Sequence, residues 1–244
     1  MKYIFLIFIL FLNISFGNNE IENSEELLKK VLKELQLTED DYNKGLYVEK
    51  ILPYDKELTV MVIPKISKQE IDEYNNYYGV FDSYIVVVNN ITKQIINKYY
   101  EKDAWTSDAV VLNKITIDTA SYILNENKKA FGVRVYYQGS SRVNPYSRED
   151  ISLFISEKDY LKKILNNYPI YELHGENNGN SKGEYETKQG KLIISNNKTN
   201  GFNNIIIKDE IVFSIYDFSN NNEVEENTIR KTFKTLQFNC IEYK

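Results

Sequence analysis

Hydrophobic and polar positions divide the chain into a helical part and a strand-rich part. Residues 18–45 carry an apolar stripe at helical spacing, formed by Leu27, Leu28, Val31, Leu32 and Leu35. Asn23 or Ser24 can cap this helix, and Thr38 can cap a second short helix, "EDDYNK", that ends at Gly45. The pattern predicts a helical hairpin packed on the main domain, with a mobile or partner-binding arm as the alternative.

From residue 46 onward, short segments rich in β-branched and aromatic residues alternate with clusters of Asn, Asp, Gly and Lys. Examples are "LTVMVI", "DSYIVVV", "FGVRVYY" and "IVFSIYDF". Such segments are typical of strands, and their regular spacing favours an all-β assembly over a parallel α/β sheet. The predicted fold is mainly β, an antiparallel sandwich or propeller-like β domain with a short N-terminal helical segment.

Three local signals modify this pattern. Asn89 and Asn90 in "VVVNNITKQII" suit the positive backbone angles of a tight hairpin turn. The segments "SKQEIDEYNNYY" from Ser67 and "SEKDYLKKILNN" from Ser156 have helical character. Residues 175–190, "GENNGNSKGEYETKQG", are polar and interrupted by glycine, which predicts a mobile loop.

The N-terminal residues have the features of a secretory signal peptide. Lys2 precedes an apolar run over residues 3–12, and Ser15 and Gly17 occupy the small-residue positions of a cleavage site after Gly17. The run is shorter than the roughly 20 residues of a comfortable membrane span, although an uncleaved anchor is the alternative. We therefore expect a signal peptide at 1–17, a helical segment at 18–45, a β-rich domain at 46–244, and a periplasmic or secreted location.

The charge of the chain bears on its partners. The formal net charge is −5, and no run of basic residues is present. Nucleic acid and anionic membrane surfaces attract basic proteins, so this mildly acidic composition indicates neither of them as the partner. Outside residues 3–12 no segment of the sequence is apolar over a length that would span a bilayer. An envelope protein or a glycan remains as the expected partner.

Cys240 is the only cysteine, so the chain cannot form an intramolecular disulfide. In "LQFNCIEYK" it alternates with Phe238, which predicts a buried, structural cysteine. A reactive or intermolecular thiol is the alternative.

Candidate catalytic and metal-binding residues are few. His174 is the only histidine and cannot supply the spacing of a zinc or copper site. The segment "SNNKTNGFNN" has the oxygen spacing of a calcium loop but offers amides where carboxylates are needed, so Asn200 and Gly201 predict a turn. Glu184 and Glu186 would share one side of a strand, as a paired-carboxylate hydrolase requires. We predict no metal and no cofactor, and we favour a protein that is not an enzyme.

The segment "FGVRVYYQGSSRVNPY" holds the candidate binding residues. Its arginine at position 134 could hold a carboxylate of this chain, from Asp108, Asp118 or Glu149, or a carboxylate of a ligand. The turn that follows contains polar groups and an aromatic ring that could meet a partner. The predicted binding residues are Arg134, Ser140, Ser141, Arg142, Asn144 and Tyr146. A corner fixed by its own hydrogen bonds is the alternative.

The blocks "TSDA", "IDTASY", "AFGVR", "GSSRVNPY" and "ISLF" occur in this order within residues 105–155. In this respect the chain resembles a family of uncharacterised exported bacterial proteins, and the resemblance implies export and a β fold. In that family the stretch near "GEYET" often holds a tryptophan and a cysteine, which this chain lacks there. The segments "TNGFNNIII" and "LQFNCIEY" also resemble the ends of propeller-like periplasmic lysozyme inhibitors.

Together these features predict an exported, non-catalytic binding protein of the periplasm or cell envelope that recognises a protein or a glycan. One alternative is a cell-wall-active hydrolase that uses paired carboxylates. The other is an envelope assembly protein whose N-terminal helices dock on a partner.

Overall fold

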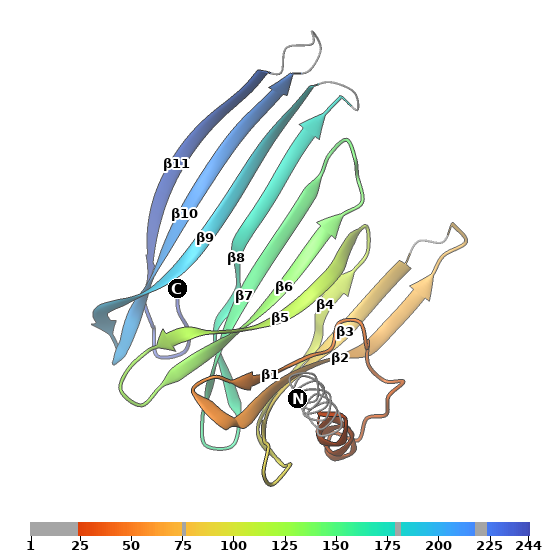
Figure 1. Ribbon diagram of the computed structural model, residues 1–244, viewed down its shortest axis with the longest axis vertical. Coiled ribbons are helices and arrows are strands. Elements are labelled where there is room, and N and C mark those ends of the chain that lie inside the picture. The colour runs from red at the N-terminus through yellow and green to blue at the C-terminus, as the bar shows by residue number, and fades with distance from the viewer. Residues whose placement is uncertain (1–23, 75–76, 179–181, 218–223) are drawn as a thin grey trace, which may run out of the picture.

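The computed structural model describes residues 24–74, 77–178, 182–217 and 224–244. Over these residues the chain is mainly β, with one short helix and two antiparallel sheets that pack as a sandwich (Figure 1). The fold prediction is therefore confirmed, with the sandwich in place of the propeller-like alternative. The predicted signal peptide, residues 1–17, lies outside the described residues. Among the described residues, no helix has the length and apolar character needed to cross a membrane.

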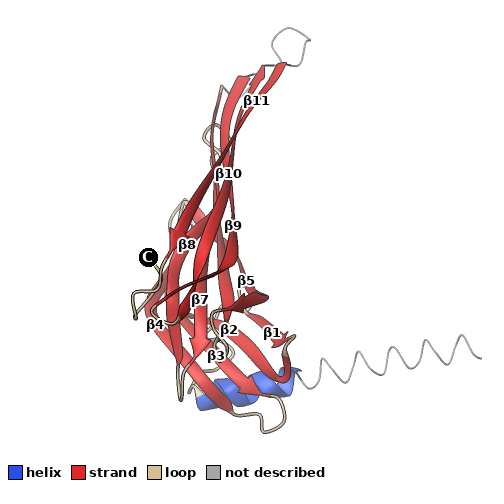
Figure 2. Cartoon of the chain, turned by 90° about the vertical axis from the view of Figure 1, so that its left-hand side faces the viewer, coloured by secondary structure: helices blue, strands red, loops and turns tan. Residues whose placement is uncertain are grey.

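The smaller sheet has four strands in the order β1-β2-β3-β4. Its strands are β1 (Val48–Leu52), β2 (Asp55–Ile71), β3 (Tyr77–Asn89) and β4 (Ile95–Ser107). Side chains on β2 alternate between two apolar environments, because Val60 and Val62 face the larger sheet while Met61 and Ile63 face the helix over residues 24–34. The helix buries Val31 and Leu32 of its predicted stripe against this outer face (Figure 2).

The larger sheet has seven strands in the order β11-β10-β9-β8-β7-β6-β5. Each strand pairs with its neighbour in sequence, so the sheet is an uninterrupted antiparallel meander. Its strands are β5 (Val110–Ile123), β6 (Lys129–Gly139), β7 (Tyr146–Ser156), β8 (Leu161–Asn177), β9 (Lys182–Thr199), β10 (Phe202–Asp217) and β11 (Val224–Leu236). The ends of β8 to β11 extend beyond the smaller sheet (Figure 1).

One apolar core lies between the two sheets. Phe81, Ile85 and Trp105 of the smaller sheet pack with Phe131 and Phe154 of the larger one. The rings of Phe131 and Phe154 stack with their centroids 5.8 Å apart, and Tyr99 meets Phe154 edge-on at 5.2 Å. These aromatic contacts join β4 to β6 and β7 across the sandwich.

A second core forms because the larger sheet coils. Leu124 near the end of β5 packs in one cluster with Ile205 and Ile207 of β10, and the amide of Asn203 donates to the Leu124 carbonyl at 2.7 Å. The C-terminal segment completes this core, since Tyr243 donates its amide to Ile164 and its hydroxyl to Asn203, at 2.7 and 2.6 Å. The two cores lie on opposite faces of β7.

Several local predictions were wrong, and tertiary contacts explain why. The second helix at "EDDYNK" does not form, because Tyr42 is buried beneath the first helix and pairs with Lys65 of β2. The "SKQEI" segment continues β2 and pairs with β3. In "SEKDYLKKILNN" the apolar residues Leu161, Ile164 and Leu165 have helical spacing, but they lie on β8. Its irregular pairing with β7 allows all three side chains to be buried.

The predicted loop, the predicted hairpin turn and the predicted burial of Cys240 also differ from the structure. Within the predicted mobile loop, residues 175–177 belong to β8 and residues 182–190 to β9, and the two strands pair, while residues 179–181 lie outside the described residues. The β3–β4 hairpin exists, but its positive φ of 56° falls on Lys93, while the Asn89 side chain accepts from the amides of Ile91 and Thr92. Cys240 is exposed, with φ of 77°, because the chain reverses there to bury Tyr243.

Replacing Phe154 with Ala tests the core between the sheets. The ring is 1% exposed, so its removal leaves a cavity, and we expect the free energy of unfolding to fall by about 3–5 kcal/mol. Urea denaturation followed by circular dichroism measures the change. Ile229→Ala on β11, where the side chain is 60% exposed, is the control and should change stability by less than about 0.5 kcal/mol. Equal effects of the two substitutions would contradict the assignment of this core.

Candidate functional site

The predicted binding corner, residues 140–146, connects β6 to β7 and is fixed against β8. The Pro145 carbonyl accepts from the Gly175 amide at 2.9 Å, and the Val143 carbonyl accepts from the Asn177 amide at 2.8 Å. Ser141 accepts from the Asn144 amide through its hydroxyl, also at 2.9 Å. The corner thus has the hydrogen bonds that the structural alternative predicted, and its backbone position is well defined.

The side chains of the corner remain exposed despite these bonds. Ser140, Ser141, Arg142 and Asn144 are exposed, and Tyr146 is half-buried. The Arg142 carbonyl accepts from the Asn177 side chain at 2.7 Å, but its guanidinium has no ion pair or hydrogen bond within the described part of the chain. A partner could therefore contact Arg142 without breaking an internal contact.

Cross-strand pairing extends the corner into a row of side chains over four strands. Tyr146 pairs with His174, His174 with Glu186, and Glu186 with Phe213. The rings of Tyr146 and His174 lie 5.1 Å apart. Since directly paired residues point to the same face of a sheet, these four side chains form one continuous surface.

His174, Glu186 and Phe213 of this surface line a cleft of about 360 Å³, here called the acidic cleft. Asn144 and Pro145 form its wall on the side of the corner. The remaining lining comes from His174, Gly175, Glu176, Glu184, Tyr185, Glu186 and Phe213. The structure thus brings the corner, the only histidine and the "GEYET" block together, although they are separated in sequence.

Three carboxylates without cationic partners dominate the acidic cleft. Glu176 lies directly opposite Glu184, and Glu186 follows on the same face. The next cross-strand pair on this face joins Lys188 to Glu172, and the two side chains form an ion pair at 3.1 Å. Lys188 is therefore already neutralised. Among the described residues, none of the three cleft glutamates forms an ion pair, and all three are exposed.

Gly175 allows the corner to approach the β8–β9 hairpin. A Cβ atom at this position would lie 2.6 Å from Cδ1 of Tyr185 and 2.8 Å from Cγ of Pro145. Both distances are shorter than a normal van der Waals contact. Only glycine at position 175 therefore allows the Tyr185 ring and Pro145 to lie this close to the backbone of β8. Tyr185 also contacts Tyr216 edge-on at 5.5 Å, which further fixes this wall of the cleft.

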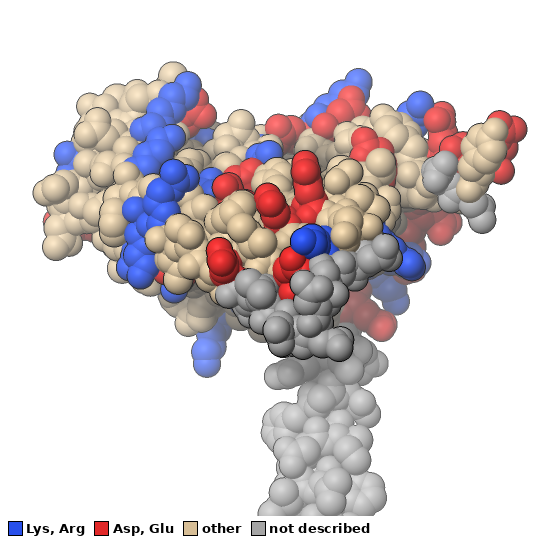
Figure 3. Space-filling view, turned by 90° about the horizontal axis from the view of Figure 1, so that it is seen from above, with Lys and Arg blue, Asp and Glu red and all other residues tan. Residues whose placement is uncertain are grey.

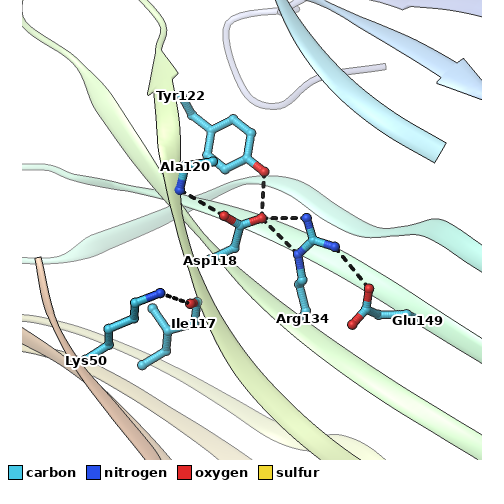
Figure 4. Close-up of polar contacts among 7 residues, drawn as sticks. All are labelled: Lys50, Ile117, Asp118, Ala120, Tyr122, Arg134 and Glu149. Atoms are coloured by element: carbon cyan, nitrogen blue, oxygen red, sulfur yellow. Dashed lines mark hydrogen bonds and ion pairs between the residues drawn. The ribbon is translucent and has the colours of Figure 1, made fainter. Parts of the chain in front are cut away.

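Arg134 lies apart from the corner, in a partly buried ion cluster (Figure 4). Its Nε and Nη2 atoms donate to Asp118 at 2.8 and 2.6 Å, and Nη1 donates to Glu149 at 3.0 Å. Two of the three carboxylates proposed from sequence therefore bind it, whereas Asp108 caps the amide of Val110. With Tyr136, Tyr171 and Gln189, Arg134 lines a separate cleft of about 180 Å³.

The environment of Asp118 shifts its titration. Burial alone would raise the pKa of this carboxyl, but hydrogen bonds from the Ala120 amide, Arg134 and the Tyr122 hydroxyl outweigh burial and lower the pKa below 3.8. For Asp150 the balance is reversed, because burial outweighs its ion pair with Arg148 and raises the pKa. In the Arg134 cluster one guanidinium thus holds two carboxylates, Asp118 and Glu149, and the lowered pKa of Asp118 shows that its ionised form stabilises the fold.

The chemistry available in the acidic cleft is limited. No group of three or more His, Cys, Asp or Glu side chains within the described ranges has the geometry to hold a metal ion. Glu184 and Glu186 lie on one side of β9, as the alternation predicted, but water solvates both. Sequence reasoning did not identify Glu176 or Phe213 as site residues, since only the register of β8, β9 and β10 brings them to the cleft.

Comparisons with protein-family models, with curated proteins and with solved structures find no match to this chain. The resemblance to exported bacterial proteins and the likeness to lysozyme inhibitors therefore stay predictions. The geometry of the site is the basis for the functional argument.

Replacing Arg134 with Ala tests the partly buried cluster. The change leaves Asp118, whose side chain is 13% exposed, without its cation, and we expect the free energy of unfolding at pH 7 to fall by about 2–4 kcal/mol. Urea denaturation measures the loss. Arg142→Ala is the matched control and should leave stability unchanged within about 0.5 kcal/mol.

The titration of Asp118 predicts the pH dependence of stability. Its pKa is lower in the folded chain than the unfolded value of about 3.9, so the ionised carboxylate stabilises the fold above that pH. This contribution is lost as the pH falls through the folded pKa. We expect stability to fall more steeply from pH 5 to pH 3 in the unaltered protein than in Asp118→Asn. Parallel curves for the two proteins would contradict this role.

Proposed function

We propose that the protein is an exported, non-catalytic binding protein of the periplasm or cell envelope. In this proposal the acidic cleft recognises a basic segment of a partner protein. The observation that carries the proposal is the direct pairing of Glu176 with Glu184, beside Glu186, with no ion pair to any of the three from the residues that the structure describes. The signal-like features of residues 1–17 support export.

The paired glutamates have an energetic cost that a cationic ligand would remove. Like charges directly opposite each other on adjacent strands repel, and they destabilise the pair relative to opposite charges. Seen from the end where the β8–β9 and β10–β11 hairpins turn, Asp and Glu side chains gather near the middle of the molecule, and a line of Lys and Arg lies towards one side (Figure 3). A Lys or Arg side chain of a partner would neutralise the glutamates.

Aromatic groups beside the glutamates suit protein recognition. Phe213 is 38% exposed at one side of the cleft, and the half-buried Tyr146 lies against His174 at the other. Tyrosine, phenylalanine and arginine supply much of the binding energy in protein interfaces, and Arg142 stands exposed on the adjoining corner. The cleft therefore combines charge for orientation with apolar area for affinity.

The hydrolase alternative has one observation in its favour, since Glu184 and Glu186 share a cleft with Glu176. Glycoside hydrolysis needs one carboxyl group that keeps its proton near neutral pH, usually in apolar surroundings. All three glutamates are exposed, so the cleft does not supply such surroundings. The binding function fits this solvated arrangement better.

The assembly alternative placed a partner on the N-terminal helix. Leu27, Val31 and Leu32 are at most 5% exposed, because the apolar stripe of the helix packs on β2 and β3. A partner could reach these side chains only by displacing the helix from the sheet. The acidic cleft is accessible without such a change.

Binding of a basic probe to residues 18–244 tests the proposed function. We expect a lysine-rich peptide and hen lysozyme, a basic protein, to bind, and Glu176→Gln, Glu184→Gln and Glu186→Gln together to weaken binding at least tenfold, or about 1.4 kcal/mol. Isothermal titration calorimetry measures the affinity. Raising the salt from 50 to 500 mM should also weaken it, because the exposed charges are screened.

The matched control changes three exposed acids elsewhere, Glu57, Glu73 and Glu126, to Gln, and so alters the net charge equally. Equal loss of affinity in the two triple variants would show only attraction to the overall charge and would contradict a cleft site. Zymography on peptidoglycan tests the hydrolase alternative. If the unaltered protein clears the peptidoglycan and Glu184→Gln does not, the cleft is a hydrolase site and the binding proposal is wrong.

A further inference from the structure

A second cleft, of about 520 Å³, lies where the two sheets meet, and is here called the basic cleft. It is formed by β4, the edge strand of the smaller sheet, and by the start of β8 in the larger one. The side chains that matter for its chemistry are Lys98, Tyr100, Tyr160, Lys162, Lys163 and Asn166. It shares no lining residue with the acidic cleft.

The acids of the basic cleft are already neutralised. Glu101 accepts from Lys163 at 2.5 Å and from the Tyr99 hydroxyl at 3.0 Å. Glu242 pairs with Lys244 at 2.8 Å. The cleft therefore keeps an excess of positive charge from its other two lysines.

Neither of those two lysines has a carboxylate partner among the residues that the structure describes. Lys98 is exposed on β4, and its ammonium has no hydrogen bond or ion pair within the described part of the chain. Lys162 donates to the carbonyl of Cys240 at 3.2 Å and lies 5.3 Å from the centre of the Phe238 ring. In a chain with a net charge of −5, this local excess of positive charge would attract an anion to the cleft.

Tyrosine rings add apolar surface between the lysines. Tyr160 is 53% exposed and Tyr100 is 46% exposed. Tyr160 offers an apolar ring face together with a hydroxyl that can donate or accept a hydrogen bond, whereas Tyr100 offers its ring, because its hydroxyl already donates to Asp82 at 3.0 Å. Such a surface suits a sugar ring, which has apolar C–H faces and hydroxyl groups around its edge.

Polar groups continue behind the basic cleft into the interior. Glu101 and Lys163 also line a cavity of about 10 Å³ between the sheets, together with Ser83 and Trp105. Ser83 is 1% exposed, and its hydroxyl oxygen has no hydrogen-bond partner in the described part of the chain. Trp105 is the only tryptophan, so its fluorescence reports directly on changes at this junction.

We propose that the basic cleft binds an acidic glycan, a saccharide chain that carries carboxylate groups. Lys98 and Lys162 contact the carboxylates, and the sugar rings lie against Tyr160 and Tyr100. Asn166 supplies an amide that can bind the hydroxyl groups. This site is independent of the acidic cleft and extends the protein to a second class of ligand.

Titration with trigalacturonic acid tests this proposal on residues 18–244. We expect binding at 50 mM salt with a change in Trp105 fluorescence, and no binding of the fully methyl-esterified trimer, which has the same rings without charge. Lys98→Glu should weaken binding at least tenfold, and Tyr160→Ala should weaken it severalfold. Both side chains are exposed, so circular dichroism should show an unchanged fold.

Lys114→Glu is the matched control, because Lys114 is also an exposed strand lysine without an ion pair in the described chain. It should keep the affinity of the unaltered protein, and so should the triple glutamine variant of the acidic cleft. No binding of the acidic trimer at millimolar concentration would overturn the proposal. Equal loss in Lys98→Glu and Lys114→Glu, or binding of inorganic phosphate equal to that of the trimer and insensitive to Tyr160→Ala, would overturn it as well.

Discussion

The structure depends on the burial of β7 on both of its faces. Residues 150–155 of this strand are all buried, with Phe154 directed to the core between the sheets and Ile151 and Leu153 to the second core. A strand that is buried on both faces needs a layer on each side. The smaller sheet supplies one layer, and the coiled end of the larger sheet with the C-terminal segment supplies the other. Beyond this region the β8–β9 hairpin covers no core, so its two strands can carry solvated charges.

Both proposed clefts draw on β8, and this strand relates them in space. Lys162 and Lys163 lie near its start, and His174 and Glu176 lie near its end. The two groups are eleven to fourteen positions apart, which corresponds to roughly 40 Å of extended strand. At this distance water and salt screen each set of charges from the other, since the Debye length is about 8 Å at physiological ionic strength. One rigid strand can therefore present opposite charges to two different ligands.

The sequence predicts much of this fold because strand propensity and burial agree over most of the chain. The helix was found from its stripe, and Glu184 and Glu186 were placed on one side of a strand by simple alternation. The prediction failed where a contact with a distant part of the chain determined the local structure. Tyr42 is buried beneath the first helix and no second helix forms, and Ile164 and Leu165 lie on a strand with irregular pairing where a helix was predicted. The acidic cleft could not be assembled from the sequence, because the pairing of Tyr146, His174, Glu186 and Phe213 is set by the register of four strands.

The order of the strands also has a consequence for how the molecule folds. Every pair of bonded strands in both sheets is adjacent in sequence, so each hairpin closes a short loop and costs little loop entropy. The sheets can grow one strand at a time from local nuclei. The second core joins segments that lie farther apart in the sequence, because it includes Leu124, which follows β5, and also Phe238 and Tyr243 from the last seven residues. Its completion must be a late event, and a chain shortened by those residues would retain its hairpins while leaving the coiled end of the larger sheet without its final apolar cover.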